Sequence, residues 1–371
     1  MKKFGSLLMS TLLCASLLAG CSSSASVSQS TVPETISTAE GAIETGSEEV
    51  SLGEMTAAKT ETSTEALEES SDDTVVRVGG LKGPTTMGLV KLMDDAKNGT
   101  AANNYEFTMV TAADELTGLV ASGKVDIALL PANVASVLYH KTEGKVSVID
   151  INTLGVLYLV SGDSSISSIE NLSGKTVYLP GKGTTPEYVL RYLISASGLS
   201  DDAVTLEFKS EASEVAAVLS EDPNAIGLLP QPFVTAAIAQ NDSLSVVLDL
   251  TKVWDSLQED GSNSRLVTGV SIVNNEFLAA HKDLVDTFLT EHEASIAYTA
   301  ADPEGAAALI EKAGIVAKAA IAQKALPACN ITYLDGQDMK DALNGYLSVL
   351  LSQNPQSVGG SLPEDDFYYL R

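Results

Sequence analysis

From residue 75 onward, short apolar runs alternate with longer amphipathic segments of helical length. The short runs are aliphatic and β-branched without an apolar/polar alternation, which is typical of strands that are covered on both faces. The pattern therefore predicts an α/β fold with a mostly parallel sheet. Strands are predicted at "VVRVGGL", "YEFTMV", "VDIALLP", "VSVID" and "TLGVLYLV", and helices at "GPTTMGLVKLMDDAKNG", "AADELTGLVASG" and "ANVASVLYH".

The same order of elements begins again near residue 175. A constant shift of 99 positions (226 − 127 and 230 − 131) places Ile127 on Ile226 and Pro131 on Pro230. Any two units of this kind resemble each other to some degree, but two consecutive units with matched turns predict two similar lobes. The repeated strands are "KTVYLPG", "VTLEFKS", "AIGLLP" and "LSVVLDL", and the repeated helices are "TTPEYVLRYLISASG", "EASEVAAVLSED" and "QPFVTAAIAQ".

The C-terminal helices have no sheet of their own, so they must cover a lobe that is already built. We therefore expect lobe 1 to comprise residues 75–157 plus 266–371, and lobe 2 to comprise residues 158–265. The chain then crosses between the lobes twice. The expected fold class is α/β with two similar three-layer lobes, joined by a two-strand hinge of the kind that permits closure.

The segment before the lobes is predicted to be a leader followed by a tether. Two lysines and an apolar run too short to span a bilayer indicate a signal peptide over residues 1–20. The run ends in "LAGC", which resembles the lipobox of bacterial lipoproteins and predicts lipidation at Cys21; the alternative is an ordinary cleaved signal in which Cys21 is incidental. Residues 21–74 are poor in bulky apolar side chains, so we expect a disordered acidic tether.

Charge and cysteine content limit the partners and the chemistry. The formal net charge is −27, and no basic cluster offsets it, which argues against nucleic acid and against an anionic membrane surface. Cys329 is the one cysteine that remains after removal of the signal and modification of Cys21, so no intramolecular disulfide is expected. The three histidines are not spaced as metal ligands, and we expect neither a metal nor a cofactor.

The turns after the predicted strands carry the candidate site, because ligands of open parallel sheets lie beyond the carboxyl ends of the strands. Two turns follow "LLP", where the proline ends the strand and polar side chains open the next helix; the alternative is that these prolines are only stiff connectors. Two others, "GGLKGPTTMG" and "PGKGTTPEY", are glycine-rich and carry threonines that serve either as helix caps or as ligand donors. Neither matches a dinucleotide or Walker motif.

Aromatic and sulfur-containing side chains near these turns are candidates to line the cleft, with core packing as the alternative for each. The lysines of the glycine-rich turns favour an anionic ligand, whereas Phe233 and Trp254 favour a ring, and the sequence leaves both open. The predicted ligand-binding residues are Gly83, Thr85, Thr86, Met87, Pro131, Asn133, Lys182, Gly183, Thr184, Thr185, Gln231, Phe233 and Trp254.

Several stretches resemble the nitrate/sulfonate/taurine and thiamine-precursor (SsuA/THI5-like) group of substrate-binding proteins. They are "ELTGLVASGKVDIALLP", "LSGKTVYLPGKGTTPEYVLRYLISASGL", "EVAAVL", "LLPQPFVTAA" and "NPQSVGGSLPEDDFYYL". The resemblance covers nearly all of residues 75–371 and implies a type II periplasmic-binding-protein fold.

The resemblance also implies a function. The implied protein is a receptor that delivers a small organic solute to an ABC permease and its ATPase. It is expected to be monomeric and non-enzymatic, and to be held by lipid on the outer face of the cell membrane. The solute is a sulfonate- or taurine-like anion or a heterocycle like a thiamine precursor. An enzyme of the same fold, which would need a titratable group in the cleft, and a lipid-anchored sensory module are the alternatives.

Overall fold

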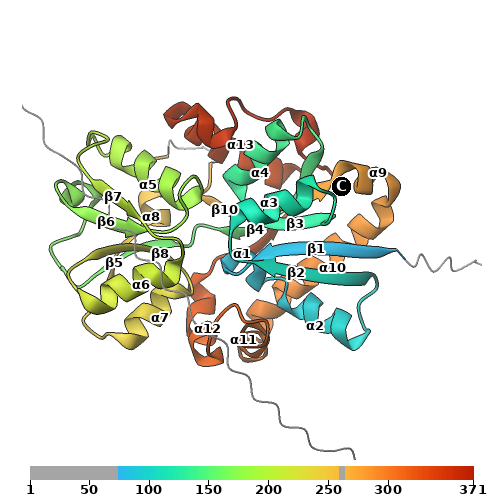
Figure 1. Cartoon of the computed structure of the whole chain (residues 1–371), viewed down its shortest axis with the longest axis horizontal. Coiled ribbons are helices and arrows are strands. Elements are labelled where there is room, and N and C mark those ends of the chain that lie inside the picture. The colour runs from blue at the N-terminus through green and yellow to red at the C-terminus, as the bar shows by residue number, and fades with distance from the viewer. Residues whose placement is uncertain (1–73, 259–263) are drawn as a thin grey trace, which may run out of the picture. The chain divides into compact units, whose positions relative to one another are not determined.

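A computed structural model describes residues 74–258 and 264–371 of the chain. All described residues belong to one compact unit, which spans Glu69–Arg371 (Figure 1). The predicted signal peptide, Cys21 and all but the last residue of the predicted tether lie outside the described residues. The expectations about them remain predictions.

Six strands form the first sheet: β1 (Val75–Leu81), β2 (Asn104–Val110), β3 (Ile127–Pro131), β4 (Val146–Leu154), β10 (Val267–Asn274) and β11 (Ile331–Leu334). Their order is β11-β4-β10-β3-β1-β2. β1 pairs in parallel with β2 and β3. β10 is antiparallel to both β3 and β4, and β11 is antiparallel to β4.

Five strands form the second sheet: β5 (Leu157–Ser161), β6 (Thr176–Leu179), β7 (Thr205–Phe208), β8 (Ile226–Pro230) and β9 (Ser245–Asp249). Their order is β7-β6-β8-β5-β9. β6 is parallel to β7 and β8, whereas β5 is antiparallel to β8 and β9.

The sheets are mixed, and here the prediction of a mostly parallel sheet is wrong for a simple reason. β5 and β10 are the strands that carry the chain from one sheet to the other. Only two residues separate the end of β4 from the start of β5. β5 therefore begins beside the edge at which β4 ends, and it is antiparallel to its neighbour β8. β10, which returns the chain to the first sheet, likewise runs against β3 and β4.

Helices cover both faces of the first sheet: α1 (Pro84–Met87), α2 (Val90–Asn98), α3 (Ala113–Ala121), α4 (Ala132–Lys141), α9 (Asn275–Ala280), α10 (Lys282–Ala301) and α13 (Gly336–Gln353). Outside this layer, α11 (Pro303–Lys312) packs on α2 and α10, and α12 (Ala319–Ala325) packs on α11. β3 shows how the two faces are covered. Its side chains alternate between the faces, so Ile127 and Leu129 pack with α2 and α10, while Ala128 and Leu130 pack with α3, α4 and α13. Burial on both faces explains the unbroken apolar run in the sequence.

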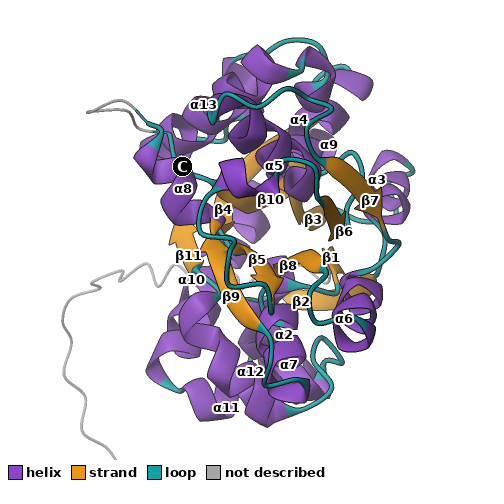
Figure 2. Cartoon of the chain, turned by 90° about the vertical axis from the view of Figure 1, so that its left-hand side faces the viewer, coloured by secondary structure: helices purple, strands orange, loops and turns teal. Residues whose placement is uncertain are grey.

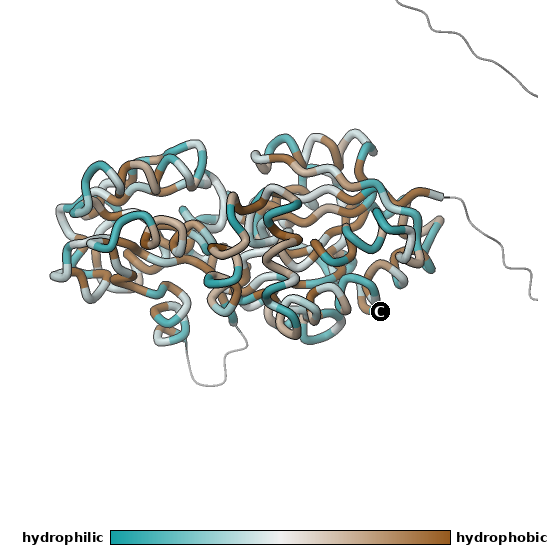
Figure 3. The backbone as a smooth tube through the Cα atoms, turned by 90° about the horizontal axis from the view of Figure 1, so that it is seen from below, coloured by the Kyte–Doolittle hydropathy of each residue, from teal (hydrophilic) through white to brown (hydrophobic). Residues whose placement is uncertain are grey.

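The second sheet is covered in the same way by α5 (Thr185–Ala196), α6 (Ala212–Glu221), α7 (Phe233–Gln240) and α8 (Leu250–Ser256). Along β5, Tyr158 and Val160 pack with α6 and α7, whereas Leu157 and Leu159 lie on the face of α5 and α8. Strands therefore lie in the middle of the described chain with helices around them (Figure 2), and many of the apolar stretches run through its interior (Figure 3). The predicted fold of two α/β lobes with helices on both faces of each sheet is confirmed.

An apolar seam joins the two lobes on one side. α13, which covers the first sheet, also contacts α5 of the second. Trp254 of α8 lies in this seam, with its ring centroid 4.7 Å from Tyr192 of α5 and 5.5 Å from Tyr346 of α13. Its side chain is fully buried. The lobes therefore share one continuous core cluster along this side.

Short 3₁₀ turns complete the described chain: η1 (Ile169–Leu172), η2 (Leu326–Ala328), η3 (Pro355–Val358) and η4 (Asp365–Phe367). In this part of the chain no helix is both long and apolar enough to cross a bilayer.

Candidate functional site

A cavity of about 490 Å³ lies where the carboxyl ends of strands from both sheets come together. The first lobe contributes the residues after β1, β2 and β3, and the second contributes those after β6, β7 and β8. Ile315, in the loop between α11 and α12, closes part of the wall. The lining residues are Leu81, Lys82, Gly83, Pro84, Thr111, Ala112, Ala113, Asp114, Pro131, Pro180, Gly181, Lys182, Thr184, Lys209, Ser210, Glu211, Ala212, Ser213, Pro230, Phe233 and Ile315.

Four of the six lining turns are the ones that the sequence predicts. The other two, 111–114 after β2 and 209–213 after β7, are missing from the prediction. A signal for them exists in the sequence. The segments "AADE" at 112–115 and "EASE" at 211–214 are related by the same shift of 99 positions (211 − 112), so the two turns are counterparts in the two lobes.

The β1–α1 turn faces the cavity only at its start. Gly83 lines the cavity, whereas the Thr86 hydroxyl donates to the Leu81 carbonyl oxygen at 2.6 Å and is fully buried. Thr85 is also buried, and its Oγ1 has no hydrogen-bond partner among the described residues. Met87 packs in the apolar cluster under α11 and α12. Thr86 and Met87 therefore hold the turn in place and do not line the cavity.

The β6–α5 turn is built from two glycines in the left-handed region, Gly181 with φ 74° and Gly183 with φ 75°. The Gly183 N–H donates to Glu187 Oε2 at 2.7 Å, so it is not available to a ligand. The Thr184 hydroxyl donates to the Gly181 carbonyl oxygen at 2.7 Å. Lys182 is exposed at the cavity, with its Nζ 5.7 Å from the centroid of the Phe208 ring.

The β8–α7 turn presents one side chain to the cavity and turns another inward. Gln231 is buried, and its Oε1 accepts from the Thr235 N–H at 3.3 Å and from the Thr235 hydroxyl at 2.9 Å. Gln231 thus satisfies the open N-terminus of α7. Phe233 remains partly exposed and lines the cavity.

The β3–α4 turn holds a contact between the lobes. Asn133 is fully buried at the start of α4, and its Nδ2 donates to the Gly183 carbonyl oxygen at 3.3 Å and to the Ser357 carbonyl oxygen at 3.2 Å. Its Oδ1 accepts from the Thr185 hydroxyl at 3.4 Å. Asn133 and Thr185 therefore form a hydrogen bond between the lobes. From this turn, Pro131 is the described residue that lines the cavity.

Twelve of the thirteen predicted residues fall into three sets. Those on the cavity are Gly83, Pro131, Lys182, Thr184 and Phe233; those buried in hydrogen bonds or turn packing are Thr85, Thr86, Asn133, Thr185 and Gln231; those in the apolar core are Met87 and Trp254. Gly183 borders a smaller adjoining pocket between the lobes. Met87 and Trp254 were predicted to line the cleft, but their side chains pack in the apolar core instead.

The charges on the cavity wall are mixed, with lysines in excess. Lys82, Lys182 and Lys209 line it together with Asp114 and Glu211. Lys209 forms an ion pair with Glu207 at 3.0 Å, and this hydrogen bond raises the pKa of the lysine. Lys82 and Lys182 have no ion-pair partner within the described residues. The helices α3, α5, α6 and α7 also begin at the cavity, and helix N-termini favour negative or electron-rich atoms.

Among the described residues, the lining of this wall includes no cysteine and no histidine. Burial raises the pKa of the Cys329 thiol to about 12, so it is a neutral thiol at physiological pH. His292 Nδ1 lies 3.0 Å from Asp150 Oδ2, and both side chains are fully buried in the first lobe. Among residues 74–258 and 264–371, no three His, Cys, Asp or Glu side chains are grouped to hold a metal ion.

The arrangement of two sheets, two crossing strands and a cavity at the strand ends defines a type II periplasmic binding protein, and comparison with known proteins agrees. The sequence pattern of the NMT1/THI5-like family matches residues 106–306, which is more than half of the chain. The chain belongs to this family, and the predicted group is confirmed. No curated protein sequence matches the chain significantly.

Solved structures with the same fold include components of transport systems. An ABC transporter protein from Parabacteroides distasonis is 25% identical, with a TM-score of 0.65 over 80% of this chain and 99% of that one. The periplasmic aliphatic sulphonate binding protein SsuA from Escherichia coli is 15% identical, with a TM-score of 0.59 over 76% of this chain and 85% of that one. The periplasmic nitrate-binding protein NrtA from Synechocystis is 9% identical, with a TM-score of 0.53 over 72% and 74%.

Proposed function

We propose that this chain is the extracytoplasmic solute-binding component of an ABC importer. The observation that carries the proposal is the cavity at the strand ends, whose wall comes from six turns divided equally between the two lobes. A molecule held there contacts both lobes, so it binds more tightly when they are closed and shifts the lobes toward the closed state. We assign residues 75–157 plus 266–371 to lobe 1 and residues 158–265 to lobe 2, with closure about the two crossing strands.

The solute is a small organic anion. Lys82 and Lys182 line the cavity and have no ion-pair partner among the described residues, and the helices α3, α5, α6 and α7 begin at its wall. With Trp254 in the core, Phe233 is the aromatic side chain left on the described wall, which weakens the case for a stacked heterocycle. Two proteins of the same fold are named for sulphonate and nitrate.

The protein binds its solute without changing it. The described residues that line the cavity include no histidine or cysteine, and the Cys329 thiol is buried and neutral. The described wall therefore lacks the imidazole and thiol groups that most often act as general base and nucleophile, and its titratable groups are lysines and the carboxylates of Asp114 and Glu211. An enzyme of the same fold would show turnover of its ligand, whereas this proposal predicts that bound solute is recovered unchanged.

A thermal-shift assay on the mature chain with Cys21→Ser tests the proposal. Sulfonates, taurine, nitrate and short carboxylates are added one at a time. An anion at 100 times its Kd adds about 2.7 kcal/mol to the free energy of unfolding, so a binder raises the midpoint clearly. A double variant, Lys82→Gln with Lys182→Gln, should lose most of the shift. Absence of a shift with every anion in the parent contradicts the proposed ligand class.

The protein is held at the membrane by lipid on Cys21 and acts as a monomer. The sequence "LAGC" before an acidic, serine-rich segment supports the anchor. Acyl chains contribute about 0.8 kcal/mol per buried CH₂, so two or more retain the protein at the surface. Cys21→Ser should move it from the membrane fraction to the soluble fraction. Retention of that variant in the membrane contradicts lipid anchoring, and a dimer mass in light scattering contradicts the monomer.

A further inference from the structure

A row of buried polar side chains leads from α10 across β4 and β10 to the wall of the cavity. Its members, which we call the polar row, are His292 of α10, Asp150, Asn152 and Thr153 of β4, and Ser271 of β10. We propose that the polar row positions the β1–α1 turn, and with it Lys82, and so sets the affinity for the anion from outside the cavity. The inference rests on the proposed function and adds positioning residues to its site.

The polar row is continuous from α10 to Asn152. His292 Nδ1 lies 3.0 Å from Asp150 Oδ2, and the Ser271 hydroxyl donates to Asp150 Oδ1 at 2.8 Å. Asn152 Nδ2 in turn donates to Ser271 Oγ at 3.2 Å. Each of these four side chains is at most 1% exposed. Because burial shields them from water, each depends on its neighbour in the row for a hydrogen-bond partner.

Thr153 connects the polar row to the cavity wall. Its hydroxyl lies 2.9 Å from Asn152 Oδ1 and 3.5 Å from the carbonyl oxygen of Pro84. The Thr153 side chain is itself fully buried, whereas Pro84 lines the cavity. Pro84 follows Lys82 by two residues, so a contact that holds this carbonyl also holds the backbone that carries the lysine.

Asn152 gives the row a second contact with the same turn. Gly269 of β10 leaves space at this point, because a Cβ there would lie 2.5 Å from Asn152 Oδ1 and 2.4 Å from Thr85 Cγ2. Asn152 and Thr85 therefore both pack against the backbone of Gly269. The row meets the β1–α1 turn at two consecutive residues.

An extra residue in β4 brings its polar side chains to one face of the sheet. Asp150 is opposite Ser271 and Thr153 is opposite Gly269, so β4 takes three steps where β10 takes two. In an unbroken strand Asp150 and Thr153 would face opposite sides. Their partners on β10 are two residues apart and share a face, so the bulge at Asn152 gives Asp150 and Thr153 the same side. Bulges of this kind re-aim side chains and are common beside functional sites.

The second lobe repeats the architecture without such a row. Asp249 follows Asp150 by the shift of 99 positions (249 − 150), but it caps α8 by accepting from the Thr251 N–H at 3.1 Å. β5 places Tyr158 opposite Asp249, where β10 places Ser271 opposite Asp150. A lobe of this kind therefore folds without a buried polar row, and apolar packing at such positions is often at least as stable. This difference between the lobes favours a role for the row in binding.

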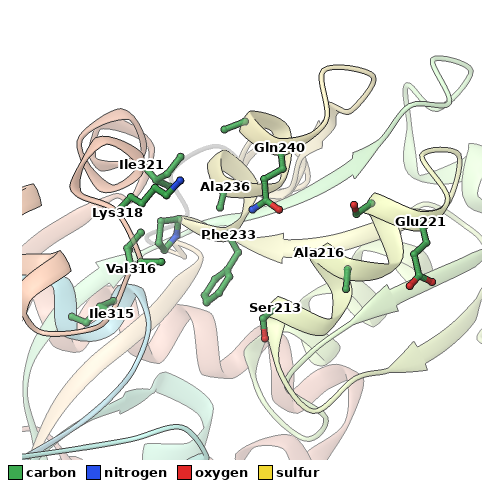
Figure 4. A pocket seen from close by; sticks show the side chains of 15 residues that line it. Ser213, Ala216, Glu221, Phe233, Ala236, Gln240, Ile315, Val316, Lys318 and Ile321 are labelled. Atoms are coloured by element: carbon green, nitrogen blue, oxygen red, sulfur yellow. The ribbon is translucent and has the colours of Figure 1, made fainter.

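Other parts of the cavity wall come from elements that carry no member of the polar row. Ser213 belongs to α6, Phe233 to α7 and Ile315 to the loop before α12. In Figure 4 the ring of Phe233 lies between Ile315 on one side and Ser213 on the other. Lys182 lies on the β6–α5 turn of the second lobe. Breaking the row should therefore act on the anion through Lys82 and leave the contribution of Lys182 intact.

Hydrogen–deuterium exchange of the mature chain with Cys21→Ser tests the positioning. Thr153→Val removes the hydroxyl and keeps the branched shape, and Thr153→Ser restores the hydroxyl. Amides in the segment 82–87 should exchange about threefold faster in Thr153→Val, and near the parent's rate in Thr153→Ser. The matched control is Thr142→Val, which removes a hydroxyl bonded to the Leu138 carbonyl oxygen at 2.8 Å at the far end of α4, and it should leave the segment unchanged. Unchanged exchange in Thr153→Val overturns the inference.

Isothermal titration calorimetry with ethanesulfonate and with nitrate tests the effect on binding. Thr153→Val should weaken Kd about three- to fivefold, because a displaced Lys82 loses part of its attraction to the anion. The same change should cost nothing further in a Lys82→Gln background and should cost its full amount in a Lys182→Gln background. A merely structural role would lower the unfolding midpoint and leave the Kd ratio equal in both backgrounds.

Ser271→Ala breaks the row one step further from the turn, and thermal unfolding establishes that each variant is folded. It should weaken Kd in the same direction, and it takes the place of Thr153→Val if that variant does not fold. If a probe binds the parent and the variants keep its Kd within about twofold, the inference is wrong and the proposed function stands. Equal losses in the two lysine backgrounds also overturn it. If neither probe binds the parent, the proposed ligand class is wrong, and the exchange result alone decides whether the row positions the turn.

Discussion

The Nδ2 of Asn133 in α4 donates to the Gly183 carbonyl oxygen across the two lobes, at 3.3 Å, and the Asn133 side chain is fully buried. The same amide donates to Ser357 and accepts from Thr185. Each polar atom of this side chain is therefore satisfied by the protein. Asn133 joins the lobes beside the cavity and does not need a ligand for its hydrogen bonds.

Asn133→Ala should therefore destabilise the protein even without ligand. Removing the amide leaves buried carbonyl and hydroxyl groups without their partner, which costs about 1–3 kcal/mol. Asn98→Ala is the control, because its amide donates to Asp94 at an exposed site and its loss should change stability by less than about 0.5 kcal/mol. Urea unfolding measures both. Equal midpoints for the two variants would show that the contact between the lobes contributes nothing.

Lys82 and Lys182, the lysines of the cavity wall that have no ion-pair partner among the described residues, should set the affinity for an anion. Lys82→Gln and Lys182→Gln should each weaken Kd about five- to tenfold, because each removes a positive charge from the cavity wall. Lys124→Gln, at an exposed position after α3, should leave Kd unchanged. The affinity of the parent should also fall with added salt, and less steeply in the two cavity variants. Identical Kd values in all four proteins would place the anion elsewhere.

Gly269 of β10 is predicted to be intolerant of a side chain. A Cβ there would lie 2.4 Å from Thr85 Cγ2 and 2.5 Å from Asn152 Oδ1, so Gly269→Ala must displace the β1–α1 turn, at about 1–3 kcal/mol. Gly118→Ala should act in the opposite direction. It lies within α3 with open space around its Cβ, and the change should stabilise the helix by about 0.5–1 kcal/mol. Opposite shifts of the urea midpoint are expected, and a stabilising Gly269→Ala would refute the packing.

Cys329 should be unreactive in the folded protein. Burial raises the pKa of its thiol to about 12, because the thiolate loses hydration, so the reactive form is scarce at pH 8 and gains population only as the pH approaches 12. The mature chain with Cys21→Ser should show no reaction with a disulfide reagent until urea unfolds it. Rapid labelling in native buffer would show that the thiol is accessible.

The sequence was sufficient to predict the turns that build the site but not the direction of their side chains. Pro131 and Pro230 end strands at the cavity, as predicted. They could be predicted because an apolar run that ends in a proline is a signal within the segment itself. Asn133 and Gln231, in contrast, resemble ligand contacts because both are polar residues beside a helix start. Whether such an amide meets a ligand or a backbone carbonyl depends on segments distant in the chain, such as Gly183 and Ser357 for Asn133.

Trp254 and Met87 illustrate the same limit for apolar residues. Each lies close in sequence to a turn and is large enough to line a cleft. Their burial comes from partners that are remote in sequence: Tyr346 of α13 lies beside Trp254, and the helices α11 and α12 cover Met87. The mixed sheets could not be predicted for a related reason, since the direction of β5 and β10 follows from the path between the lobes and not from their own residues.

Native mass spectrometry of the mature chain with Cys21→Ser, before and after unfolding and refolding, tests the central claim most directly. The account predicts that part of the purified protein carries a small organic anion. The extra mass should disappear on refolding in ligand-free buffer and should be absent from the double variant Lys82→Gln with Lys182→Gln. A parent that carries no small molecule, and that takes up none of the sulfonates, carboxylates or nitrate added to it, would contradict solute binding between the lobes.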